Sequence, residues 1–150
     1  MKQRFTAPAG VVLMLTKIVG GRRKILLQRR KNTGFADGLW DLSSSGHVEK
    51  DESMKQAAAR ECLEEIGVKI KTDDLKFVCF IHKKDGDVIY YYCYFICDKF
   101  TGEPEIMEKN KCSELIWVDM ENLPEDTVAD RKIAVAAYFG GTHYIEYGWQ

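Results

Sequence analysis

Several features that mark specialised classes of protein are missing from this sequence. Its 22 Lys and Arg residues are balanced by 23 Asp and Glu residues, and the formal net charge of −1 lacks the basic excess typical of a nucleic-acid binder. Residues 1–5 lack the apolar stretch and cleavage site of a signal peptide, and no segment is apolar for long enough to cross a bilayer. We therefore expect a cytoplasmic protein that associates with neither membranes nor nucleic acids.

The cysteines also lack a recognisable pattern. There are five, an odd number, and none are spaced as CxxC. Cys93 and Cys97 lie four residues apart in a predicted strand, a spacing that suits neither a zinc knuckle nor a local disulfide. We expect buried, reduced thiols, as is usual for a cytosolic protein.

The chain of 150 residues has the length of one domain, and its hydrophobic share of 45% is ordinary for a globular protein. Hydrophobic patterning and turn residues predict interleaved strands and helices, with a loop over residues 31–38. Strands are expected at 10–19, 24–28, 75–82, 88–97 and 115–118, with an alternating segment at 40–48 and a second helix at 126–139. This order predicts one α/β domain, residues 1–150, with helices on the faces of a sheet.

The first helix is clearly delimited. Ser53 can act as its N-cap, and Gln56 three residues later completes a capping box. Gly67 can supply the left-handed residue that ends it.

This helix carries an unusual acidic face. Glu61, Glu64 and Glu65 are spaced i, i+3 and i+4, so that they lie within one turn on one side of the helix, where they repel each other. Clustered carboxylates suit a hard cation such as Mg²⁺ or Mn²⁺. A merely solvated helix face is the alternative for such a cluster taken alone.

Residues 46–68, GHVEKDESMKQAAARECLEEIGV, resemble the Nudix box at each of its defining positions. Gly46 opens the motif, Glu52 and the Arg60–Glu61 pair follow at the required spacings, and Cys62 fills a position usually held by a larger aliphatic residue. The last fixed positions of the motif are Leu63, Glu64, Glu65, Ile66, Gly67 and Val68. The resemblance implies the Nudix fold, a mixed β-sheet sandwiched between α-helices.

The same resemblance implies roles for the motif residues. Glu61 and Glu65 would be the principal ligands of Mg²⁺ or Mn²⁺, and Glu64 would be a further ligand or the catalytic base. The carbonyl oxygen of Gly46 would also bind the metal, and Glu52 would contact it through water. Arg60 would hold a catalytic glutamate in place by charge-assisted hydrogen bonds.

In MutT-type family members the base lies on a later loop. A similar loop here, Gly102-Glu103-Pro104, would place that base at Glu108, with Glu105 as the second choice. A simple acidic surface loop is the alternative.

Residues outside the motif would select the substrate. Arg29 resembles a phosphate-contacting arginine of MutT-type enzymes, and Asp41, which follows Trp40, is placed to read a base edge. Phe35 could stack on a base or join a small core, and Asp130 could face the pocket. His47 is assigned only a structural hydrogen bond.

The resemblance therefore predicts a metal-dependent, MutT-like pyrophosphohydrolase that cleaves a nucleoside triphosphate or another nucleoside diphosphate derivative. An ADP-ribose or nucleotide-sugar pyrophosphatase is the main alternative. A further alternative is an isomerase, because residues 40–47 resemble isopentenyl diphosphate isomerase, and another is a non-catalytic nucleotide sensor. The expected partner is a small nucleotide, and a homodimer is left open.

Overall fold

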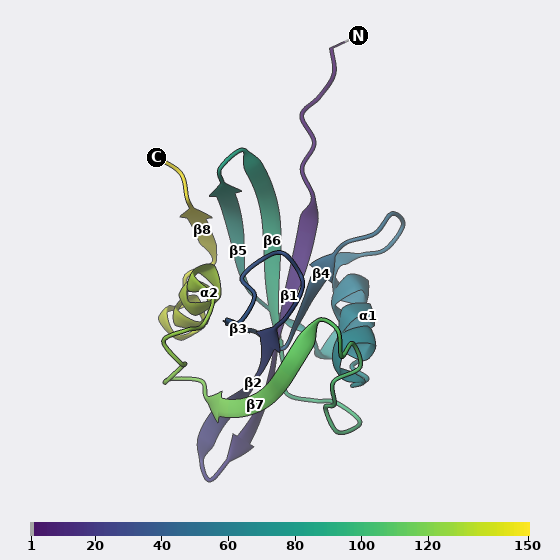
Figure 1. Ribbon diagram of the computed structural model, residues 1–150, viewed down its shortest axis with the longest axis vertical. Coiled ribbons are helices and arrows are strands. Elements are labelled where there is room, and N and C mark those ends of the chain that lie inside the picture. The colour runs from purple at the N-terminus through teal and green to yellow at the C-terminus, as the bar shows by residue number, and fades with distance from the viewer. Residues whose placement is uncertain (1) are drawn as a thin grey trace.

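A mixed β-sheet forms the centre of the computed structural model, which describes residues 2–150 (Figure 1). Met1, the first residue of the stretch expected not to be a signal peptide, lies outside the described residues. The strands are β1 (Ala9–Val19), β2 (Arg22–Arg30), β3 (Trp40–Asp41), β4 (Ser44–His47), β5 (Lys76–Asp85), β6 (Val88–Cys97), β7 (Cys112–Asp119) and β8 (Tyr144–Tyr147). The helices are α1 (Met54–Ile66), α2 (Ala129–Gly140) and the short 3₁₀ helix η1 (Thr72–Asp74).

The strand order creates a fork beside β1. The main path is β3-β2-β1-β6-β5-β8, in which β1 runs parallel to β6 and β5 runs parallel to β8. On its other side, β1 pairs with β4 along 10–13 and with β2 along 16–19. Because one strand is shared in this way, β4 and β2 diverge from each other, and the space between them is available for a site.

The two α-helices, α1 and α2, cover opposite faces of the sheet, as Figure 1 shows. Side chains alternate along β1, so that Leu13 packs in the core with Cys62 and Ile66 of α1, whereas Met14 packs in the core with Ala134 of α2. This arrangement confirms the predicted α/β fold, a mixed sheet sandwiched between helices.

The local signals at α1 are confirmed. Ser53 Oγ accepts a hydrogen bond from the Gln56 amide at 3.1 Å, and Gln56 Oε1 accepts one from the Ser53 amide at 2.8 Å. Gly67 follows the helix at a φ of 70°, in the left-handed region. The motif helix thus begins and ends where its sequence predicts.

Several elements differ from the prediction. The segment 40–48 forms two short strands, because the buried Ser43 side chain hydrogen-bonds to two neighbouring strands, accepting from the Leu15 amide and donating to the Leu26 carbonyl. Helix α2 begins at Ala129, three residues after its predicted start at 126. The edge strand β8 was not predicted.

All five cysteines are buried and free, as expected. Burial raises the pKa of the Cys62 and Cys79 thiols to about 12, so both stay protonated at neutral pH. Among the described residues, neither α1 nor α2 is long and apolar enough to span a membrane.

Candidate active site

A cavity of about 550 Å³ lies in the fork between β2 and β4. Strand β2 contributes Gln28 and Arg30 to its wall, and β4 contributes the segment 45–47. The acidic face of α1 closes one end, while the loop 31–38, Tyr92 of β6 and Arg131 of α2 line the remainder. The Nudix-like motif and the loop 31–38, which carries Phe35, therefore face one common space.

Carboxylates gather at the α1 end. Glu61, Glu64 and Glu65 all line the cavity, and Glu108 joins them from the segment before β7. Burial raises the pKa of Glu65 to about 8, and burial also raises the pKa of Glu61. Glu65 accepts a hydrogen bond from the Ser45 amide at 2.9 Å, and within residues 2–150 no Lys or Arg forms an ion pair with it. A cation at this end would stabilise the charged form of that carboxyl group.

Arg60 connects the acidic side chains. Its guanidinium donates to both oxygens of Glu52 at 2.7 and 3.0 Å, and to Glu61 at 2.7 Å. It also donates to Glu64 at 3.2 Å and to the His47 carbonyl at 3.0 Å. Because Arg60 occupies both oxygens of Glu52, and Glu52 does not line the cavity, the structure places Glu52 as a support for Arg60.

Gly46 lies in close contact with the Glu61 side chain of α1. A Cβ atom at this position would lie 2.2 Å from the carboxyl carbon of Glu61. No side chain larger than hydrogen fits there unless Glu61 moves. The glycine that opens the motif thus lets the β4 backbone approach a glutamate of α1 directly.

The loop that carries Glu108 is fastened to the end of α1. The Glu105 amide donates to the Ile66 carbonyl at 3.0 Å, and the Met107 amide donates to the Glu65 carbonyl at 3.1 Å. Glu105 itself is exposed and lies outside the cavity lining, so of the two loop glutamates only Glu108 reaches the site.

The oxygen atoms at the α1 end of the cavity are of the kind that binds a hard divalent cation. Within residues 2–150, no three Asp, Glu, His or Cys side chains are already arranged to hold a metal ion together. The oxygens available at this end are the carboxylates of Glu61, Glu64, Glu65 and Glu108 and the backbone of Gly46, all hard ligands of the kind that Mg²⁺ and Mn²⁺ prefer. Arg60 bonds to only one carboxylate oxygen of Glu61 and one of Glu64, which leaves the second oxygen of each side chain available as a ligand.

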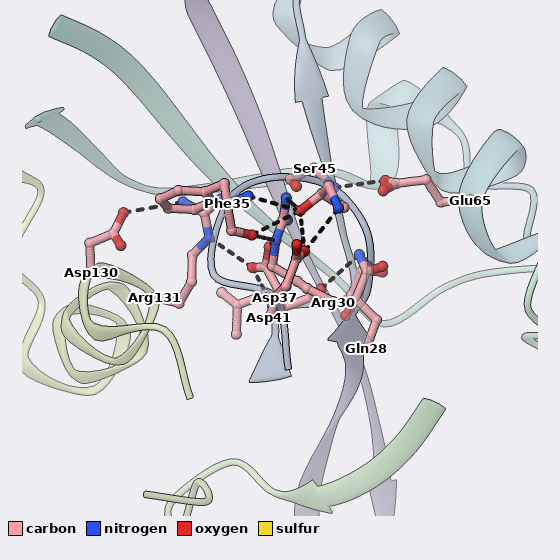
Figure 2. Close-up of polar contacts among 12 residues, drawn as sticks. Gln28, Arg30, Phe35, Asp37, Asp41, Ser45, Glu65, Asp130 and Arg131 are labelled. Atoms are coloured by element: carbon pink, nitrogen blue, oxygen red, sulfur yellow. Dashed lines mark hydrogen bonds and ion pairs between the residues drawn. The ribbon is translucent and has the colours of Figure 1, made fainter. Parts of the chain in front are cut away.

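Asp41 lies beneath the cavity and does not line it. Its side chain is fully buried, and its two oxygens accept hydrogen bonds from Arg30 at 2.7 Å and Arg131 at 2.8 Å (Figure 2). Burial alone would raise the pKa of Asp41, but the charges of Arg131 and Arg30 outweigh it and hold that pKa below its usual value. A direct contact between Asp41 and a nucleobase is therefore not available, and Asp41 fixes the two arginines instead.

Two other expected substrate residues also lie outside the lining. Arg29 points away from the cavity and pairs with Asp126 at 3.0 Å. Asp130 is buried between Lys83, at 3.5 Å, and Arg131, at 3.3 Å. Phe35 does line the cavity, where its ring lies 4.7 Å from Lys83 Nζ. Figure 2 shows Phe35 and Asp41 between Glu65 on the α1 side and Asp130 on the α2 side.

Sequence reasoning missed Arg30, Arg131 and Tyr92, all of which line the cavity. Arg30 had a signal, because residues 29–31 form a basic run, Arg-Arg-Lys, and neighbouring strand residues point to opposite sides. Arg131 and Tyr92 lack a local signal and reach the site only through the packing of α2 and β6.

A family model described as the NUDIX domain matches residues 7–138. The chain belongs to the Nudix family. The CTP pyrophosphohydrolase of Escherichia coli (strain K12) is 27% identical over 131 residues, which cover 86% of this chain and 91% of that relative. An uncharacterized Nudix hydrolase, YvcI of Bacillus subtilis (strain 168), is 31% identical over 107 residues, which cover 67% of this chain and 63% of that relative.

Solved structures show the same fold at low identity. A MutT NUDIX hydrolase from Burkholderia pseudomallei matches with a TM-score of 0.76 and 24% identity, over 89% of this chain and 98% of that chain. The NUDIX domain of Shewanella oneidensis NrtR, complexed with ADP ribose, matches with a TM-score of 0.74 and 19% identity, over 92% of this chain and 90% of that chain. This Nudix hydrolase is thus an enzyme of a family that acts on pyrophosphate bonds.

Proposed function

We propose that this Nudix hydrolase is a divalent-metal-dependent pyrophosphohydrolase that cleaves a nucleoside triphosphate or another nucleoside diphosphate derivative. One observation supports this most: a single cavity has five glutamate side chains, Glu49, Glu61, Glu64, Glu65 and Glu108, toward one end and aromatic and cationic side chains toward the other. A nucleotide has the same two-part chemistry, a phosphate chain that binds metal and a flat base.

At the carboxylate end, Glu61, Glu65 and the Gly46 carbonyl would hold Mg²⁺ or Mn²⁺, with Glu64 as a further ligand. The bound ion would lower the pKa of the attacking water and neutralise charge on the phosphate oxygens. Arg60, braced by Glu52, keeps Glu61 and Glu64 on the cavity side of α1. The free thiols also fit a cytoplasmic location, which is part of this proposal.

Two glutamates are candidates for the base that takes the proton of the attacking water. Glu64 is about half exposed and bonded to Arg60, whereas Glu108 stands on the loop fastened to α1. Replacing the base by glutamine should lower kcat by about 100- to 10,000-fold while KM changes little. We expect this result for one of Glu64→Gln and Glu108→Gln, measured by steady-state kinetics with saturating Mg²⁺. Equal, small losses in both variants would exclude both assignments.

The experiment that tests the function is a substrate panel. The protein is incubated with the four common nucleoside triphosphates, ADP-ribose and a nucleotide sugar, with Mg²⁺ or with EDTA, and the products are separated by ion-exchange chromatography. CTP is included because one relative is named a CTP pyrophosphohydrolase, and ADP-ribose is included because a solved NUDIX domain of the same fold is complexed with it. We expect Mg²⁺-dependent release of a nucleoside monophosphate from at least one triphosphate.

Other outcomes would point to the alternatives. Cleavage of only ADP-ribose or the nucleotide sugar would indicate an ADP-ribose or nucleotide-sugar pyrophosphatase, and not a triphosphatase. Nucleotide binding without cleavage, measured by calorimetry on the same panel, would indicate a sensor. Conversion of isopentenyl diphosphate without release of phosphate would indicate an isomerase.

A further inference from the structure

We propose that Lys111 binds the third phosphate of a nucleoside triphosphate and so determines the length of the phosphate chain that the site prefers. The proposal rests on the proposed function and narrows its substrates to nucleoside triphosphates, as opposed to diphosphate derivatives that lack this group. Lys111 lines the cavity beside Glu108 and is not one of the groups proposed to hold the metal ion.

Lys111 differs from the other cationic side chains of the cavity in having unused donors. The guanidinium groups of Arg30, Arg60 and Arg131 each donate hydrogen bonds to a carboxylate. The Nζ atom of Lys111 lies 3.7 Å from a carboxylate oxygen of Glu108, which is too far for a hydrogen bond, and within residues 2–150 it forms no other ion pair. Its three N–H donors are therefore available to an anion in the cavity.

The backbone of Lys111 is held from two sides. Its amide donates to the Glu108 carbonyl at 2.9 Å, and its carbonyl accepts a hydrogen bond from the Lys31 amide, just after β2, at 2.9 Å. The Met107 amide bonds to the Glu65 carbonyl, so the segment before β7 lies beside α1 (Figure 1). The half-exposed side chain of Lys111 thus starts from a fixed point near the carboxylates, while its amino group can turn toward a ligand.

The negative charge at the α1 end is the reason why a third phosphate needs a cation of its own. Five glutamate side chains line the cavity. The terminal phosphate of a nucleoside triphosphate carries about 1.5 to 2 negative charges at pH 7, so these glutamates repel it. A lysine ammonium group is a compact point charge with three donors, which suits a terminal phosphate. A diphosphate that is capped by a sugar has no such group for Lys111 to bind.

A simple surface ion pair with Glu108 is the alternative role for Lys111. An exposed pair of this kind contributes little to stability, and it would not distinguish one nucleotide from another. The two roles therefore differ in selectivity, which can be measured with nucleotides that share a base and differ in the number of phosphates.

The test measures binding of nucleotides that cannot be cleaved between the first two phosphates. Calorimetric titrations in Mg²⁺ buffer compare the α,β-methylene analogues of ATP and CTP with those of ADP and CDP. We expect the native protein to bind one triphosphate analogue at least about tenfold more tightly than its diphosphate counterpart, because a hydrogen bond between charged groups is worth roughly this much. In Lys111→Gln the preference should fall by at least this factor, while the affinity for the diphosphate analogue stays the same. Lys111→Arg, which keeps the charge, should retain the preference.

Lys109 provides a matched control in the same turn. It is exposed, carries the same charge and does not line the cavity. Lys109→Gln therefore changes the net charge by the same amount as Lys111→Gln, but it should keep the full preference for the triphosphate analogue.

The proposal is overturned if the native protein shows no preference in either pair, if Lys111→Gln keeps the preference, or if Lys109→Gln loses as much of it. Equal weakening of both analogues in Lys111→Gln would also overturn it, because this would indicate a structural role for the pair with Glu108. Failure of the proposed function is a separate result, which would appear as absent hydrolysis in the substrate panel, whereas these titrations need no cleavage.

Discussion

At the scale of single residues, the buried charges beneath the cavity determine which side chains can meet a substrate. Asp41 was expected to read a base edge, yet it holds Arg30 and Arg131 in place. Asp130 adds a second carboxylate between Arg131 and Lys83. Three cations thus share two carboxylates, and the floor of the cavity carries a surplus of positive charge.

Asp41→Asn should destabilise the protein strongly. The substitution leaves the buried Arg131 guanidinium and the half-buried Arg30 guanidinium beside a neutral amide, and breaking a buried ion pair costs about 3–5 kcal/mol in the free energy of unfolding. Urea denaturation at pH 7 measures the difference. The control is Asp37→Asn, because Asp37 is exposed and bonds only to its own loop, and its effect should be much smaller.

The stability difference between the native protein and Asp41→Asn should also depend on pH in a defined way. The pKa of Asp41 is lower in the folded protein than its usual value of 3.8, so its contribution to stability is complete above about pH 4. That contribution is lost as the pH falls through the lowered pKa. The stability difference between native protein and Asp41→Asn should therefore be constant from pH 5 to 7. A difference that shrinks over this interval would contradict a lowered pKa.

Gly46→Ala tests the close contact between β4 and α1. The new methyl group would overlap the Glu61 carboxyl group and displace it, and a misplacement of about 1 Å in an active site can cost about 100-fold in rate. We expect kcat to fall by about this factor. Gly140→Ala is the control, since a Cβ atom there meets nothing closer than 4.0 Å. Unchanged kcat in Gly46→Ala would show that the position of Glu61 is not critical.

At the scale of elements, the sequence predicted α1 completely because its signals are local. The capping box at Ser53 and the left-handed Gly67 are set by residues within one turn of each end. Helix α2 lacks such a signal, since its N-cap is Val128, whose side chain makes no capping hydrogen bond. Strand β8 has four residues and is formed by parallel pairing with β5, some 60 positions earlier. Its own sequence therefore carries no signal that predicts a strand.

The two ends of α1 should contribute differently to activity. Gly67→Ala forces a side chain into the left-handed region and places a Cβ atom 3.1 Å from Met107 Sδ, on the loop that carries Glu108. Ser53→Ala removes only the N-cap, which costs about 1 kcal/mol. Both variants should lose stability, whereas only Gly67→Ala should also lose kcat. Thermal unfolding and steady-state kinetics on both proteins check this, and equal kcat values would show that the loop is not positioned by the helix end.

At the scale of the whole molecule, the fork beside β1 creates the site. Because β1 pairs with β4 and then with β2, residues from five strands and helices meet in one cavity. The Nudix motif predicted the residues at the α1 end of that cavity, because the residues of the motif lie within one segment of the sequence. At the opposite end only Arg30 had a signal in the sequence, whereas Tyr92 and Arg131 could not be predicted because they reach the cavity only through tertiary packing.

We propose that the carboxylates of α1 carry out hydrolysis through a divalent metal ion. The most direct test compares native protein with the Glu61→Gln, Glu65→Gln double variant, using Glu105→Gln, outside the cavity, as the control. Mg²⁺ should raise the Tm of the native and control proteins, since the ion binds only the folded carboxylates, and should leave the Tm of the double variant unchanged. Mg²⁺-dependent kcat on the best nucleotide should fall in the double variant by at least about 100- to 1,000-fold. A double variant that keeps both the Tm shift and the turnover of the native protein would show that these carboxylates do not bind the catalytic metal ion.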